Sequence, residues 1–158
     1  KYHTAPLAKE SASATMAQMF LQQKIAMHLS GRWLVPKYRE EANFDWDVIN
    51  FPNGDNGSVV PLDSSGWAVS KDSQHKEEAF KLVNYLSSKK NIEKLTESGL
   101  IVPARRDVQN SKYFLDNKKP FNSRVFINVI KTAKPTPINI HYREILDKLT
   151  PEFEKMFN

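Results

Sequence analysis

Apolar residues recur three or four positions apart along much of the chain, a spacing that predicts amphipathic helices. The stretches with this spacing are residues 8–22, 33–42, 73–87, 91–98, 120–133 and 142–157. We expect Asp72 and Ser73 to cap the third helix and Gly99 to end the fourth in a left-handed conformation. We also expect Pro151 to restart the last helix, because proline fits the first helical turn.

Alternating or short apolar stretches predict strands at residues 24–29, 45–51 and 66–70, with a Gly- and Asn-rich loop at 52–57. Trp46 lies in the middle of an alternating stretch, and we expect it in the core. So few strands do not make a self-sufficient sheet, because sheets average about five to six strands. The pattern therefore predicts a helix-rich α/β chain that is a fragment of a longer protein, its missing strands lying upstream.

Composition narrows the possible functions. The chain has 158 residues and a net charge of +5, but acidic residues are mixed with the basic ones, so we do not expect a nucleic-acid partner. Cysteine is absent, which excludes disulfides and thiolate chemistry. The histidines are scattered without metal-ligand spacing, so no metal site or cofactor is expected. No apolar run approaches the roughly 20 residues of a membrane-spanning helix.

Two carboxylates offer the best case for catalysis. Asp45 and Asp47 share one face of a predicted strand and could act as an acid/base pair on a sugar. Glycoside hydrolases, however, hold their carboxylates about 5–10 Å apart across a cleft. A polar outer face is the simpler interpretation, and a sugar-acting hydrolase stays open as an alternative.

Two tryptophans follow glycines at predicted strand boundaries. Trp33 ends the sequence Ser-Gly-Arg-Trp of residues 30–33, and Trp67 ends Ser-Ser-Gly-Trp of residues 64–67. An indole ring packs well on the C–H face of a sugar while polar neighbours bind the hydroxyls. Both rings could equally belong to the core.

The order of several motifs resembles a known family. MFLQQKIAMHLSGRW (19–33) is similar to a helix, a Gly-Lys-x-Ala-Met strand and a Gly-x-Trp turn, with Gln23 where glycine is usual. DVINFPNG (47–54), GWAVSK (66–71) with KEEAFKLVNYL (76–86), and SGLIVPAR (98–105) match its later motifs. The chain thus resembles the C-terminal portion of the extracellular solute-binding proteins of ABC importers, in the sugar-binding group of maltose-binding protein.

The resemblance implies part of a type II periplasmic-binding-protein-like fold, in which two α/β lobes close on a ligand. Residues 1–50 and 118–158 would belong to the C-terminal lobe, and residues 55–115 to the N-terminal lobe. By resemblance, Trp33 in its Gly-x-Trp turn stacks on a sugar. The implied ligand-binding residues are Gly31, Arg32, Trp33, Ser65, Trp67 and Tyr142.

The same resemblance implies a non-catalytic receptor without a cofactor. It would bind a carbohydrate, deliver it to the permease subunits of an ABC importer, and work in the periplasm or on the cell surface under a lipid anchor. A peptide or polyamine is the alternative ligand. A third possibility is that a chain lacking half of each lobe associates with itself, most readily by domain swapping.

Overall fold

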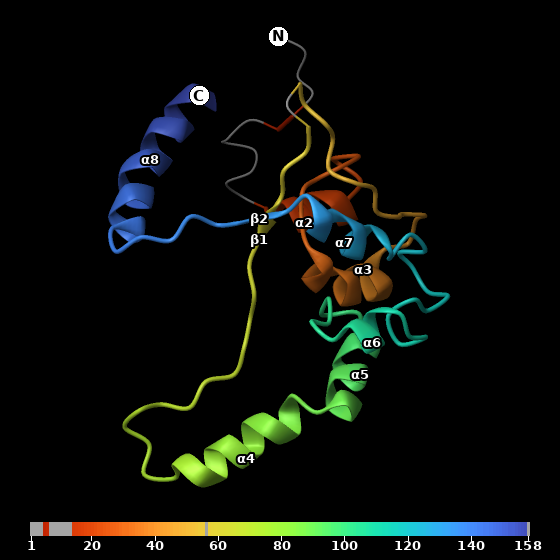
Figure 1. The fold of residues 1–158 in the computed structure, drawn as a ribbon. Coiled ribbons are helices and arrows are strands. Elements are labelled where there is room, and N and C mark those ends of the chain that lie inside the picture. Colours follow the sequence, from red (N-terminus) through yellow and green to blue (C-terminus); the bar gives the residue numbers. More distant parts are fainter. Residues whose placement is uncertain (1–4, 7–13, 56, 158) are drawn as a thin grey trace. The chain divides into compact units, whose positions relative to one another are not determined.

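The computed structural model describes residues 5–6, 14–55 and 57–157 (Figure 1). Its helices, in chain order, are α2 (Met16–Leu21), the 3-10 helix η1 (Arg32–Leu34), α3 (Val35–Glu41), α4 (Lys76–Leu86), α5 (Lys89–Glu97), α6 (Arg106–Gln109), α7 (Val125–Asn128), the 3-10 helix η2 (Val129–Lys131) and α8 (Tyr142–Phe157). Strands β1 (Pro61–Leu62) and β2 (Lys134–Pro135) pair in parallel. The chain divides into two compact units, Lys1–Ser30 with Pro137–Asn158, and Gly31–Thr136.

In the first unit, α2 is closed at both ends by local hydrogen bonds. The Thr15 hydroxyl accepts a bond from the Gln18 N–H, and the Gln18 side chain accepts one from the Thr15 N–H. At the C-terminal end, Gln23 adopts φ +57° and Lys24 N–H donates to Met19 O, which is a Schellman motif. The left-handed Gln23 explains why glycine is usual here. Residues 8–13 of the predicted helix lie outside the described residues.

Helix α8 of the same unit runs unbroken from Tyr142 to Phe157, with Pro151 inside it. The predicted restart at Pro151 is therefore wrong. Proline removes one backbone donor from the helix, but the remaining i to i−4 hydrogen bonds maintain the helix on either side.

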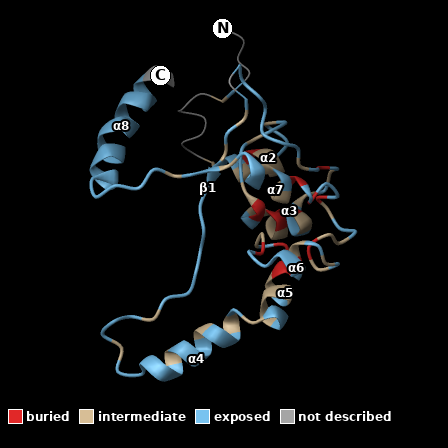
Figure 2. Cartoon of the chain, in the orientation of Figure 1, coloured by how far each residue is buried: buried red, intermediate tan, exposed pale blue. Residues whose placement is uncertain are grey.

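The second unit contains a small core around α3 and α6 (Figure 2). Its buried apolar residues are Val35, Tyr38, Trp46, Val108, Phe114 and Val125. The prediction that Trp46 is a core residue is confirmed, because it is 9 % exposed and its ring meets that of Tyr38 edge-on at 5.4 Å. Helix α4, by contrast, has no buried residue.

The predicted helices of this unit are confirmed with shifted bounds. Pro36 lies in the first turn of α3 as expected. Helix α5 ends where predicted, with Gly99 at φ +88°. Helix α4 begins only at Lys76 and lacks the predicted cap, since the Ser73 hydroxyl accepts a bond from the His75 N–H instead. The predicted helix 120–133 is reduced to α7 and η2, after a turn at 121–124.

The predicted strands at 24–29, 45–51 and 66–70 are wrong for this structure, in which these described residues are irregular or extended without a ladder. A strand requires backbone hydrogen bonds to a neighbour, which the sequence pattern does not supply. Residues 45–48 are held instead by hydrogen bonds from the Lys119 side chain and from the backbone and side chain of Asn122. The lobe boundaries proposed from the sequence stay a prediction.

Candidate functional site

The turn before α3 presents an exposed indole ring. Leu34 N–H donates to Gly31 O at 3.3 Å, which closes η1, and Trp33 projects from it with 64 % of its surface exposed. The Trp33 ring lies back over Gly31, because a Cβ placed on Gly31 would be only 1.9 Å from Trp33 Cζ3. Gly31 itself adopts φ −121° and ψ 178°, an ordinary extended conformation. Glycine is therefore needed here for the space that the ring occupies.

Arg32 points the other way, into the core, and is 2 % exposed. Its Nη1 donates to the Ser123 hydroxyl at 3.3 Å, and its guanidinium lies 4.2 Å from the ring centroid of Phe114 and 5.6 Å from that of Phe126. Arg32 Nε and Nη2 have no hydrogen-bond partner among the described residues. Burial, helped by the Arg39 charge, lowers the pKa of Arg32 to about 10, so the group is charged at neutral pH.

Arg32 therefore joins the Trp33 turn to the segment that contains Phe114 and Ser123. Cation–π contacts with two rings offset part of the cost of burying its charge. In this structure the guanidinium faces aromatic rings rather than solvent. Its predicted contact with a ligand stays a prediction.

The other predicted site residues are distributed more widely. Ser65 and Trp67 lie in the extended segment between β1 and α4, where Trp67 is 58 % exposed. In the described part of the chain, no hydrogen bond, ion pair or ring contact joins them to Trp33. Tyr142 begins α8 in the other unit and is 39 % exposed. Within the unit Gly31–Thr136, the structure brings Gly31 and Trp33 together, with Arg32 anchoring their turn.

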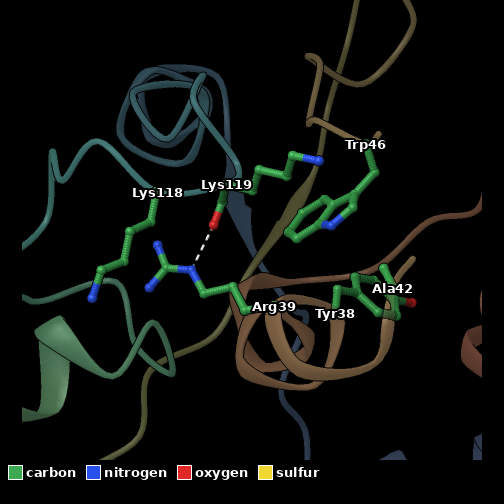
Figure 3. A pocket seen from close by; sticks show the side chains of 6 residues that line it. All are labelled: Tyr38, Arg39, Ala42, Trp46, Lys118 and Lys119. Carbon is green, nitrogen blue, oxygen red and sulfur yellow. Dashed lines mark hydrogen bonds between the residues drawn. The ribbon is translucent and has the colours of Figure 1, made fainter. Parts of the chain in front are cut away.

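A second cluster was not foreseen from the sequence. The side chains of Tyr38, Arg39, Ala42, Trp46, Lys118 and Lys119 line a hollow of about 310 Å³ (Figure 3). Arg39 Nη2 lies 3.0 Å from both carboxylate oxygens of Asp116, and Arg39 Nε donates to Lys119 O. These bonds fix α3 to the segment 116–119. The sequence signal was the pair Lys118-Lys119, but nothing local links it to α3.

The two carboxylates considered for catalysis have structural partners. Asp45 forms an ion pair with Lys119, which lowers the pKa of that carboxyl, chiefly through a hydrogen bond. Asp47 Oδ1 accepts bonds from the backbone N–H groups of Val48 at 2.8 Å and Asn122 at 3.0 Å. Each carboxylate is therefore used in a structural contact within the unit Gly31–Thr136.

No group of three or more His, Cys, Asp or Glu side chains that could hold a metal ion occurs among residues 5–6, 14–55 and 57–157. Over the same described ranges, every helix is too short or too polar to cross a bilayer.

The sequence matches the profile of a described protein family. The profile of the family described as "bacterial extracellular solute-binding protein" matches residues 1–121. The chain belongs to this family. It is 30 % identical over 129 residues to the maltodextrin-binding protein MdxE of Bacillus subtilis, covering 80 % of this chain and 30 % of that protein. It is 24 % identical over 146 residues to a binding protein of Brucella abortus, covering 91 % of this chain and 35 % of that one.

A solved structure shows the same fold. An ABC substrate-binding protein of Listeria monocytogenes, in complex with cycloalternan, superposes with a TM-score of 0.81 at 23 % identity. The match covers 98 % of this chain and 39 % of the Listeria protein. The predicted partial, periplasmic-binding-protein-like fold is thereby confirmed. The chain spans about a third of the length of its curated relatives, 30 % of one and 35 % of the other.

Proposed function

We propose that this chain is the C-terminal portion of a carbohydrate receptor that delivers its ligand to an ABC importer. The observation that carries the proposal is the exposed Trp33 ring, held over Gly31 in a chain of the extracellular solute-binding family. Indole rings stack on the apolar faces of sugars. The maltodextrin-binding relative and the cycloalternan complex support a carbohydrate as the ligand.

The receptor works by closing, without chemistry on the ligand. A ligand that touches both lobes only in the closed state favours that state by its difference in affinity. We assign residues 1–50 and 118–158 to one lobe and residues 55–115 to the other, with Ser65, Trp67 and Tyr142 as further contacts. The permease subunits are the protein partners, and the receptor sits in the periplasm or on a lipid anchor outside the cell.

Isothermal titration of the intact receptor, at its natural length, with glucans of increasing size tests the proposal. Trp33→Ala is expected to weaken saccharide binding by about 1–3 kcal/mol, as truncation of a buried anchor ring does elsewhere. Heat with peptides or polyamines but with no saccharide would overturn the carbohydrate assignment. Unchanged affinity in the variant would remove Trp33 from the site.

A further inference from the structure

An open hollow of about 410 Å³ lies beside the one in Figure 3 and shares Trp46 and Lys119 with it. Asp45, Asp47 and Phe121 complete its lining. All five residues belong to the unit Gly31–Thr136. None of them is among the ligand-binding residues predicted from the sequence.

The Phe121 ring is exposed on a turn that is fixed on both sides. The ring is 65 % exposed, while its neighbours Pro120 and Ser123 are fully buried. Asn122 donates from its backbone to Asp47 Oδ1 at 3.0 Å and from its side chain to Val48 O at 3.1 Å. A large apolar ring held in solvent by such contacts is already ordered for binding, which reduces the entropy lost when a ligand docks.

Polar groups surround this ring. The Asp45 side chain is fully exposed and is held by the Lys119 ammonium. Asp47 uses Oδ1 for the two backbone N–H groups, and its Oδ2 accepts no hydrogen bond from the described residues. The hollow therefore offers one apolar face, carboxylate acceptors and an ammonium donor within a few side chains.

We propose that this hollow is a second saccharide subsite, which takes a sugar unit beyond the one at Trp33; the inference rests on the proposed function. A sugar ring presents a C–H face to Phe121 and hydroxyls that donate to Asp45 and Asp47 and accept from Lys119. An anionic ligand would meet two carboxylates. An amine would meet the Lys119 ammonium, which already neutralises Asp45.

One contact connects this hollow with the Trp33 turn. Arg32, next to Trp33, donates to the Ser123 hydroxyl at 3.3 Å, and Ser123 is two residues from Phe121. The two exposed rings are thus carried by turns that are bonded to each other. On this proposal, a ligand long enough to span the two turns contacts both rings, whereas a short sugar bound at one ring contacts that ring alone.

The test compares Phe121→Ala with Phe80→Ala in the intact receptor. Phe80 is a matched control, because it is 59 % exposed on α4 and does not line the hollow. Titration with maltose and with longer maltodextrins should show that Phe121→Ala lowers affinity about 3- to 10-fold for the longer ligands only. Phe80→Ala should change neither affinity. In parallel, the indole N–H resonance of Trp46 should shift with long maltodextrins and not with maltose.

Each other outcome overturns the inference. An equal loss for short and long ligands would place Phe121 at the main site. If Phe121→Ala binds all ligands unchanged and the Trp46 resonance does not shift, no saccharide occupies the hollow. The proposed function would still be supported if Trp33→Ala weakens saccharide binding. A Trp46 shift with spermidine but not with maltodextrins would make the hollow an amine site. If the unmodified receptor binds no saccharide, the proposed function and the inference both fail.

Discussion

A methyl group added at residue 31 is expected to displace the Trp33 indole while leaving the stability of the fold nearly unchanged. In Gly31→Ala the new Cβ would lie 1.9 Å from Cζ3 and 2.3 Å from Cε3 of Trp33, so the ring must leave its place. The backbone need not change, because φ −121° and ψ 178° are open to alanine. The ring is 64 % exposed and can rotate into solvent with little loss of buried surface.

The expected magnitudes follow from these contacts. Stability should change by less than about 1 kcal/mol, since the small loss of burial is offset by the reduced entropy of the unfolded chain. Saccharide binding should weaken by up to the full contribution of a stacked ring, about 1–3 kcal/mol, which is about 5- to 150-fold. Gly31→Ala would then resemble Trp33→Ala in affinity although the indole is still present.

Urea denaturation and isothermal titration of the intact receptor measure the two quantities. Gly66→Ala is the matched control, because a Cβ on Gly66 would meet nothing within 4 Å and the residue also precedes a tryptophan. The control should match the unmodified receptor in both assays. Full affinity in Gly31→Ala would refute the reasoning, since the ring would then bind the sugar from another orientation.

Two further changes test the left-handed positions of the backbone. Gly99→Ala should destabilise the receptor by about 1–3 kcal/mol, because φ +88° is strained for alanine and the Cβ would lie 2.9 Å from Val35 Cγ1. An unchanged urea midpoint would contradict this, since it would mean that α3 and the end of α5 can move apart at no cost in free energy. Gln23→Gly should stabilise it by about 0.5–1 kcal/mol, because relief of the strain at φ +57° exceeds the entropy that glycine adds to the unfolded chain. A lower urea midpoint would contradict this balance.

The structural features that were predicted best are those set by residues close together in the sequence. Helix α5 and its Gly99 end follow from local hydrogen bonds, and the family follows from motifs in a set order. The inward turn of Arg32 was not predictable, because charged side chains are usually exposed and its partners Phe114 and Ser123 lie far along the chain. The Asp45–Lys119 pair spans 74 residues, which no local pattern encodes.

The structure of residues 45–51 depends both on the local sequence pattern and on contacts with residues distant in the sequence. Its alternation correctly predicted that Trp46 is buried while Asp45 and Asp47 are exposed, although the expected strand ladder is absent from these described residues. Period-two burial requires only an extended backbone against a core. The ladder was inferred from the alternation, yet residues 119–122 supply side-chain contacts in its place. The same three hydrogen bonds bring Phe121 beside both carboxylates, so the hollow combines a local pattern with contacts from one distant segment, residues 119–122.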